Sequence, residues 1–282
     1  MEFFDSRPAV TQLGLAYGPG IPGFLDSNPA AVDYVELPFE QLRHSPELAS
    51  IQDAVPLILH CASMSVAGFV PPSETTVQAI GRAAARTRSP WIGEHLAFVS
   101  ADGINEAAER DSAPTNLTYT ICPQLSEETV ERVAANLASL RSCFEVPIIL
   151  ENSPQYFAIP GSTMNMVDFI GEVAARCEVG LLLDLSHFLI TSLNTGVDAV
   201  KELERMPLER VVEIHVSGLS AQSDIVWDDH ASPAPPEIFV LLERVLERVR
   251  PRALTLEYNW SAFPQPLLLS HIADTRKALA GA

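Results

Sequence analysis

Histidines and carboxylates recur in this 282-residue chain at or near the ends of short apolar runs. Imidazoles occupy this position in LILHC, WIGEHL and VVEIHV, and carboxylates occupy it in IILEN, GLLLD and LTLEY. Others follow closely in LLLDLSH and WDDH. Together they form a set of nine: His60, His95, Glu151, Asp184, His187, His215, Asp228, His230 and Glu257. Mixed nitrogen and oxygen donors of this kind suit iron, manganese or zinc, whereas a thiolate site would need cysteines.

The elements that must position these residues are eight apolar runs rich in Val, Ile and Leu, which alternate with amphipathic stretches. The runs are Gln12–Tyr17, Tyr34–Leu37, Pro56–Cys61, Trp91–Leu96, Val146–Glu151, Val179–Leu185, Val211–Val216 and Ala253–Tyr258. Ser126 is expected to cap one of the helices, with Glu127 and Glu128 in its first turn. A helix near residues 22–31 is predicted least well, because Pro, Gly and Asp crowd it.

Strands that alternate with helices predict an α/β fold, a (β/α)8 TIM barrel. We expect one domain over residues 1–282, with a long βα loop inserted at about residues 99–125. In a barrel, such loops build the active face, so this one is expected to act as a lid or a partner surface.

The carboxyl ends of barrel strands converge on one mouth, which would crowd all nine donors together. Uncompensated carboxylates there would repel one another, and bound cations would remove that cost. One such histidine alone is more often a hydrogen-bonded core residue, but here six consecutive strands each end in a possible ligand. Nine donors exceed the needs of one ion and suit two or three ions about 3.5–4 Å apart. The sequence therefore predicts a multinuclear metal site.

Two neighbouring residues have open roles. Glu213 lies two residues before His215, so strand alternation points both side chains into the barrel. It either orients His215 from outside the ligand set or pairs within the barrel interior. Asn152 follows Glu151 and is expected to contact a metal or the substrate.

Composition excludes several classes of protein. Thirty-six acidic and 18 basic residues give a net charge of −18, which disfavours binding to nucleic acid or to an anionic membrane surface. No apolar run approaches the roughly 20 residues of a membrane helix. The four cysteines form no disulfide framework, and residues 1–10 do not read as a secretory signal, so we expect a cytoplasmic protein.

Several segments also carry a family resemblance. They are LHCASMSV, GEHLAF, LENSPQY, STMNMVDF, GLLLDLSH, LERVVEIHVSG and DDHASP. From about Gly14 to Glu257 the chain resembles the DUF692 family of multinuclear non-heme iron-dependent oxidative enzymes, which includes methanobactin and thiaglutamate biosynthesis enzymes. That family belongs to the xylose-isomerase-like barrel superfamily. The resemblance implies two or three irons and the use of dioxygen to modify residues, often cysteine, of ribosomally made precursor peptides, usually with a small partner protein that presents the peptide.

The resemblance also divides the ligands among the metals. The first metal would be held by His60, His95 and Glu151. The second would share Glu151 and add Asp184, His215 and Glu257. The third would be held by His187, Asp228 and His230. Many family members have Asn-Asn where this chain has Ser186 and His187, and the extra imidazole favours a full third site.

Two other classes of function compete with this one. A zinc- or manganese-dependent hydrolase or isomerase could use the same barrel, as in endonuclease IV or xylose isomerase. The acidic surface disfavours DNA cleavage, and sugar isomerisation would need a lysine near the site, whereas Lys201 and Lys277 both lie in helical stretches. A non-catalytic metal-binding adaptor is the third class, and it would require a fully ligated, inert site.

Overall fold

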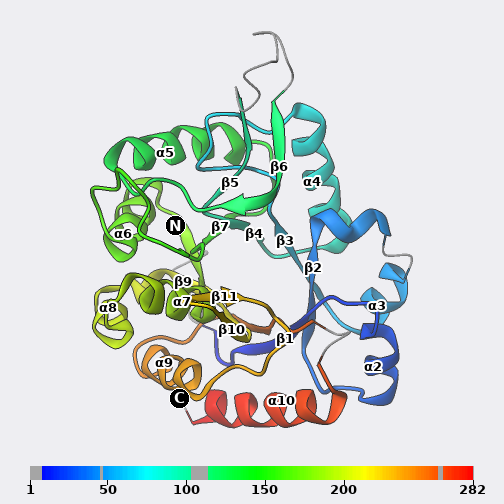
Figure 1. The fold of residues 1–282 in the computed structure, drawn as a ribbon. Helices are drawn as coiled ribbons and strands as arrows, with labels where there is room; N and C mark the ends of the chain where they lie inside the picture. Colours follow the sequence, from blue (N-terminus) through cyan, green and yellow to red (C-terminus); the bar gives the residue numbers. More distant parts are fainter. Residues whose placement is uncertain (1–7, 45–46, 103–113, 260–262, 282) are drawn as a thin grey trace.

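Eight parallel strands close into a barrel in the order β1–β2–β3–β4–β7–β8–β9–β12 (Figure 1). The computed structural model describes residues 8–44, 47–102, 114–259 and 263–281. The barrel strands are β1 (Gln12–Ala16), β2 (Tyr34–Pro38), β3 (Leu57–Cys61), β4 (Ile92–His95), β7 (Ile148–Glu151), β8 (Gly180–Asp184), β9 (Val211–Val216) and β12 (Ala253–Leu256). This architecture confirms the predicted (β/α)8 barrel.

Helices surround the barrel (Figure 1). The α-helices are α2 (Ile21–Ser27), α3 (Leu48–Ala54), α4 (Glu74–Thr87), α5 (Glu127–Arg141), α6 (Met166–Cys177), α7 (Leu185–Thr195), α8 (Ala199–Arg205), α9 (Pro236–Leu246) and α10 (Gln265–Ala280). The short 3-10 helices are η1 (Phe39–His44) and η2 (Leu208–Arg210). Ser126 caps α5 as predicted, because its hydroxyl accepts the backbone N–H of Thr129. No helix in the described ranges has both the length and the apolar composition needed to cross a membrane.

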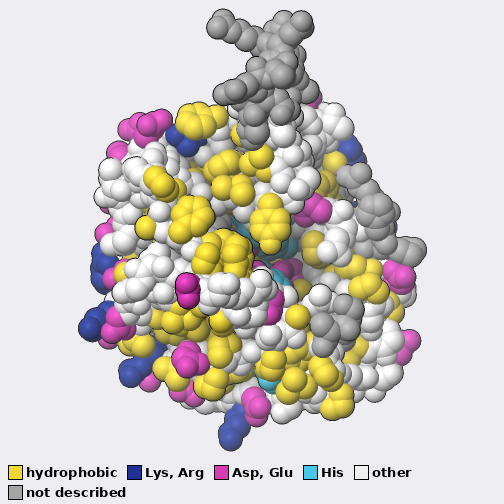
Figure 2. Space-filling view, in the orientation of Figure 1, with side chains coloured by type: hydrophobic (Ala, Val, Ile, Leu, Met, Phe, Trp, Pro, Cys, Tyr) yellow, Lys and Arg dark blue, Asp and Glu magenta, His cyan; other side chains and the backbone are white. Residues whose placement is uncertain are grey.

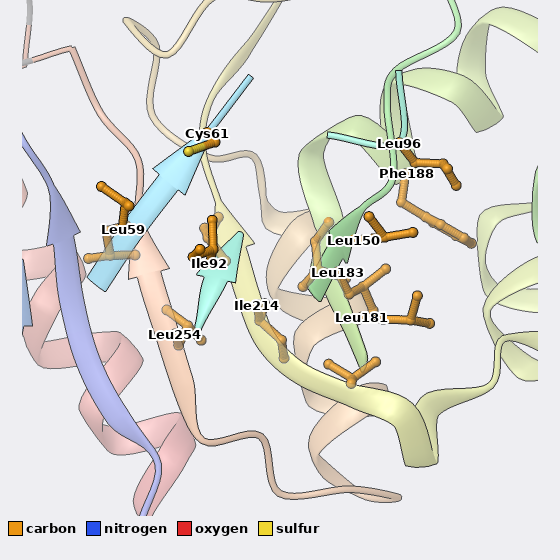
Figure 3. Packing of buried hydrophobic residues seen from close by; sticks show 14 of the residues in the cluster. Leu59, Cys61, Ile92, Leu96, Leu150, Leu181, Leu183, Phe188, Ile214 and Leu254 are labelled. Atoms are coloured by element: carbon orange, nitrogen blue, oxygen red, sulfur yellow. The ribbon is translucent and has the colours of Figure 1, made fainter. Parts of the chain in front are cut away.

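Side chains alternate between the two faces of each barrel strand. Those that face outward pack beneath the helices in one large apolar core, in which Leu59, Cys61 and Ile92 lie close together (Figure 3). Those that face inward form a second, smaller cluster. Its members are Tyr34, Ile58, Trp91, Ile149, Leu182, Val212 and Ala253.

The inward cluster forms an apolar floor directly below the predicted ligands. Ile58 precedes His60 by two residues on β3, and Leu182 precedes Asp184 by two residues on β8. Because residues two apart share one face of a strand, His60 and Asp184 point into the barrel one layer above these apolar side chains. The ligands therefore lie at the carboxyl ends of the strands.

Two antiparallel hairpins stand beyond the carboxyl ends of barrel strands. β5 (Phe98–Ala101) pairs with β6 (Thr115–Ile121) after β4, and β10 (Leu219–Gln222) pairs with β11 (Ile225–Asp228) after β9. The strands of the first hairpin overlap the predicted loop at residues 99–125, of which residues 103–113 lie outside the described ranges, as do residues 1–7. Both hairpins stand at the end of the barrel where its strands finish.

Candidate metal centre

The strand register brings the predicted ligands side by side. His95 is the partner of Glu151 across β4 and β7, and Asp184 is the partner of His215 across β8 and β9. His60 pairs with Gly93, where a Cβ atom would lie 2.8 Å from the His60 Cδ2 atom. The absence of a side chain on Gly93 therefore makes room for the His60 imidazole.

The first group of donors consists of His60, His95 and Glu151. The Glu151 Oε2 atom lies 2.7 Å from His60 Nε2 and 3.3 Å from His95 Nε2. His95 Nδ1 lies 3.2 Å from the Cys61 carbonyl oxygen, so a hydrogen on Nδ1 donates to that carbonyl and leaves Nε2 free to bind a cation. One donor atom from each of these three residues lies within 4.8 Å of a donor atom of the other two.

The second group, formed by Asp184, His215 and Glu257, contains two buried atoms whose hydrogen-bonding needs are unmet. Asp184 Oδ1 accepts the backbone N–H of His187 at 2.7 Å and so caps α7, but Oδ2 has no hydrogen-bond partner. His215 Nδ1 also has none, and it lies 3.3 Å from Glu257 Oε2. Buried polar atoms normally form hydrogen bonds, so the two atoms that form none call for an explanation. A cation held among these three side chains would satisfy both atoms, and the donor set fits iron, manganese or zinc.

The third group is built on β11 and the start of α7. Asp228 Oδ2 lies 3.2 Å from His187 Nε2 and 2.7 Å from His230 Nε2. The backbone of His230 adopts a left-handed conformation with φ of 51°. For a residue other than glycine this conformation carries strain, and such strain concentrates at functional sites.

Glu151 joins these groups into one cluster. Its Oε2 atom contacts His60 and His95, while its Oε1 atom lies 3.2 Å from His187 Nδ1 and 3.9 Å from His215 Nδ1. All nine predicted ligands therefore lie together at the barrel mouth, and the groups overlap, because donor atoms of Glu151, Asp184 and His187 also lie within 4.8 Å of one another. That they bind metal ions stays a prediction.

Burial and neighbouring charges shift the pKa values of the imidazoles and carboxylates in this cluster. Burial raises the pKa of Glu151, but the imidazoles of His95 and His60 outweigh burial and hold it well below its usual range. Burial lowers the pKa of His60, yet the Glu151 carboxylate raises it to about 10. Glu257 and Asp228 likewise overcome burial and raise the pKa of His230 to about 10. Protonated imidazoles thus neutralise the carboxylates, and a divalent cation would neutralise them in the same way while displacing protons.

The two residues with open roles both lie within the protein interior. The Asn152 amide donates to the Asp184 carbonyl and its oxygen accepts the Asp184 N–H, both at 2.9 Å, so its side chain clamps the end of β8. Glu213 points into the barrel, where Oε2 accepts the Trp91 indole N–H at 2.7 Å. Its closest approach to His215 Nε2 is 3.9 Å.

One residue of the site, Glu36, escaped the sequence analysis. Its carboxylate is buried on β2 and lies 2.8 Å from His215 Nε2. The sequence feature that could have indicated Glu36 is an acidic residue inside the short apolar strand YVELP. Burying a charge there costs free energy unless the charge has a partner. Glu36 lies in the middle of β2, so it falls outside the pattern of donors at strand ends.

The centre lies within a hollow on the face of the molecule shown in Figure 2. Figure 2 shows histidine and carboxylate atoms inside this hollow, hydrophobic side chains around it, and Lys and Arg only toward the periphery of the face. A cavity of about 450 Å³ between β6 and the β2 and β3 ends includes His95, Ser63 and Tyr119 in its lining. On β11, the Trp227 ring stacks on Tyr156 with centroids 4.4 Å apart. The two lysines lie elsewhere, on α8 and α10.

Comparison with families of known proteins gives a match over nearly the whole chain. Residues 12–280 match the family described as RiPP precursor modification enzyme MbnB/TglH/ChrH, where RiPP denotes a ribosomally synthesised and post-translationally modified peptide. A UPF0276 protein of Caulobacter vibrioides is 28% identical over 263 residues, which cover 92% of this chain and 90% of that protein. A UPF0276 protein of Rhizorhabdus wittichii is 29% identical over 259 residues, which cover 90% of this chain and 89% of that protein.

Solved structures similar to this one share its fold at low sequence identity. A xylose isomerase domain-containing protein from Salmonella typhimurium superposes with a TM-score of 0.61 at 13% identity, covering 96% of this chain and 97% of that chain. Endonuclease IV from Thermus thermophilus superposes with a TM-score of 0.55 at 14% identity, covering 96% of this chain and all of that chain (100%). These likenesses confirm a xylose-isomerase-like barrel.

Proposed function

The chain belongs to the MbnB/TglH/ChrH family of RiPP precursor modification enzymes, and from this membership we propose that it uses iron and dioxygen to oxidise a cysteine-containing precursor peptide. In this reaction dioxygen is the oxidant and the peptide is oxidised. Two or three iron ions would occupy the donor groups at the barrel mouth.

The observation that carries the proposal is the make-up of two donor groups. His60, His95 and Glu151 form one set of two imidazoles and a carboxylate, and a second set of the same composition is His187, His230 and Asp228. Two histidines and one carboxylate, with coordination positions left open, are typical of non-heme iron oxygenases. Bound iron would supply the one-electron chemistry that dioxygen requires.

The chain's own residues would hold and shield the reacting parts. Glu151 lies between donor groups and can serve more than one ion, because each of its oxygens faces different imidazoles. The apolar floor below the ligands, which includes Ile149 and Leu182, keeps water out from beneath. The peptide would enter from the open mouth through the cavity beside His95.

We also propose that a small partner protein presents the peptide at this mouth. Large hydrophobic side chains are exposed on segments that follow the carboxyl ends of strands: Phe69 after β3, Tyr119 on β6, Phe157 after β7 and Trp227 on β11. Exposed apolar side chains that gather around a site mark places where other molecules bind (Figure 2). Calorimetry of the precursor peptide, with and without the candidate partner, tests this, and equal affinity in both titrations would contradict it.

The test of the function begins with protein purified without air and loaded with ferrous iron. Incubation with a cysteine-containing precursor peptide should change the peptide mass only when both iron and dioxygen are present. The Glu151→Gln variant should lose bound iron and the mass change, since this carboxylate contacts three imidazoles. Glu172→Gln is the matched control, because Glu172 is exposed on α6 and touches only Arg176 among the ion pairs of the described residues.

The competing hydrolase or isomerase class predicts a different result. Zinc- or manganese-loaded protein would then turn over an aldose or cleave DNA at an abasic site, with no need for dioxygen. A mass change in the peptide that proceeds equally without iron, or without dioxygen, would refute the oxidative function.

A further inference from the structure

We infer that Glu36 is a positioning residue that selects one tautomer of His215, so that Nδ1, and not Nε2, faces the metal centre. The inference rests on the proposed metal centre, but it does not depend on which metal binds or on the oxidation of any peptide.

The contacts of the His215 ring carry this inference. Nε2 lies 2.8 Å from Glu36 Oε2, a distance at which an N–H on Nε2 donates to the carboxylate. Nδ1 is buried without a hydrogen-bond partner and lies 3.3 Å from Glu257 Oε2 and 3.9 Å from Glu151 Oε1. When a cation displaces the second hydrogen of the ring, a hydrogen held on Nε2 leaves the lone pair on Nδ1. That lone pair faces the carboxylates of the proposed second metal.

His215 differs in this respect from two other histidines of the site. His95 and His187 each place Nδ1 against a backbone carbonyl, at 3.2 and 3.0 Å, and turn Nε2 toward a carboxylate of the centre. His215 has the reverse arrangement, and its partner is a side chain. Substitution cannot remove a backbone carbonyl, but it can remove the Glu36 carboxylate, so the orientation of His215 is open to test.

The floor of the barrel holds Glu36 in place. The Thr255 hydroxyl lies 3.3 Å from Glu36 Oε2 and 3.0 Å from Glu213 Oε1, and the Tyr34 hydroxyl donates to Glu213 Oε1 at 3.2 Å. All these groups are buried. They enclose the Glu36 carboxylate, whose Oε2 atom lies beside His215 Nε2.

Glu36, Glu213 and His215 could in principle hold a cation of their own, since one donor atom from each lies within 4.8 Å of the others. The hydrogen bonds argue against this alternative. Glu213 already accepts the Trp91 N–H at 2.7 Å on one oxygen and the Tyr34 O–H at 3.2 Å on the other. A cation there would face these hydrogens, so a hydrogen on His215 Nε2 is the better partner for Glu36.

The direct test is nitrogen-15 NMR of histidine side chains in the zinc-loaded wild-type protein. Long-range spectra distinguish a ring that binds metal through Nδ1 from one that binds through Nε2, and the His215 signals are assigned by their loss in His215→Asn. We expect His215 to bind zinc through Nδ1 and to carry its hydrogen on Nε2, while His95 and His187 bind through Nε2. A His215 ring bound through Nε2, or one that binds no zinc, would overturn the inference.

A substitution tests the role of the carboxylate. In Glu36→Gln, the amide can present either its oxygen or its NH2 group to Nε2, so the tautomer is no longer selected. We expect one zinc ion to bind 10- to 100-fold more weakly by chelator competition, as is typical when the partner of a ligating histidine is lost. The other zinc ions should bind as in wild type.

Glu94→Gln is the matched control. Glu94 is equally buried on β4, which β3 separates from β2, and its carboxylate accepts the backbone N–H of Met64 at 3.1 Å. Zinc affinity should be unchanged in this variant. Equal weakening in both variants, or none in Glu36→Gln, would refute the role of Glu36. If Glu36→Gln does not fold, the wild-type spectrum still decides the inference, and none of these readouts depends on peptide oxidation.

Discussion

Replacing Gly93 by alanine should displace the His60 imidazole from the metal centre. The added Cβ atom would lie 2.8 Å from His60 Cδ2 and 3.2 Å from Leu182 Cδ1. Carbon atoms pack best at about 3.5–4.0 Å, so the ring would have to retreat by roughly 1 Å. The ring has little freedom to do so, because its Nε2 atom lies 2.7 Å from Glu151 Oε2.

The size of the effect follows from this overlap. Overfilling a packed interior by one methyl group costs about 1–3 kcal/mol. A ligand must also stay within about 0.5 Å of its productive position, so a shift of roughly 1 Å should weaken the ion bound by His60, His95 and Glu151. We therefore expect Gly93→Ala to unfold more easily and to bind one metal ion more weakly than the wild type.

Urea unfolding of the metal-free protein and a zinc titration measure the two effects separately. Gly171→Ala is the matched control: it adds the same methyl group inside α6, where the new Cβ atom would meet nothing within 4 Å. Alanine should stabilise that helix by about 0.5–1 kcal/mol relative to glycine. The glycine-to-alanine substitution should thus lower the free energy of unfolding at position 93 and raise it at position 171. A Gly93→Ala protein that is as stable as wild type and binds zinc equally well would refute the reasoning.

Four further predictions concern the charge, the floor and the mouth of the centre. Glu151 raises the pKa of His60 to about 10, so zinc binding at pH 7 should release protons, and zinc affinity should rise as the pH rises toward 10. Released protons bind the buffer, so the calorimetric heat of zinc binding should depend on the buffer. A heat that is the same in all buffers would contradict this prediction. The same shift means that metal-free protein should lose stability between pH 6.5 and about 10, and thermal unfolding should show a smaller loss in His60→Gln, where His230 still titrates with a pKa raised to about 10. Gly14→Ala would place a Cβ atom 2.3 Å from the Tyr34 ring, and should lower the melting temperature more than Gly93→Ala does. Trp227→Ala should raise the KM for the peptide by about tenfold, equivalent to about 1.4 kcal/mol, without changing bound metal, and an unchanged KM would count against a peptide surface at this ring.

The barrel and the meeting of its ligands could be predicted because they depend on short-range patterns. Continuous apolar runs such as IIL and LLL predict buried parallel strands, and Ser126 followed by two glutamates predicts the start of α5. Once the strands form a barrel, residues at their carboxyl ends must converge. The convergence of His60, His95 and Glu151 is thus a consequence of topology, which the sequence specifies through its periodicity.

The first helix and the mouth were harder to predict. α2 begins at Ile21 and ends at Ser27, whereas a helix was expected near residues 22–31. A proline lies in its first turn, where the missing N–H of proline costs no hydrogen bond. In the described part of the chain around residues 99–125, β5 pairs with β6, and these cross-strand pairs join residues distant in sequence such as Phe98 and Ile121. Local periodicity carries little information about such pairs.

Strand period and barrel closure fix which side chains reach the mouth, so this set follows from the pattern along the chain. The contacts that each side chain makes there depend on how the strands pack in the folded protein. Glu36 comes from the strand before the predicted ligands and meets His215, 179 residues away, and this contact turns Nδ1 toward the proposed second metal. Asn152 clamps the backbone of Asp184, although its position beside Glu151 suggested a ligand or substrate contact. Hydrogen-bond direction depends on distances of a few tenths of an ångström between strands, and no pattern along one strand encodes them.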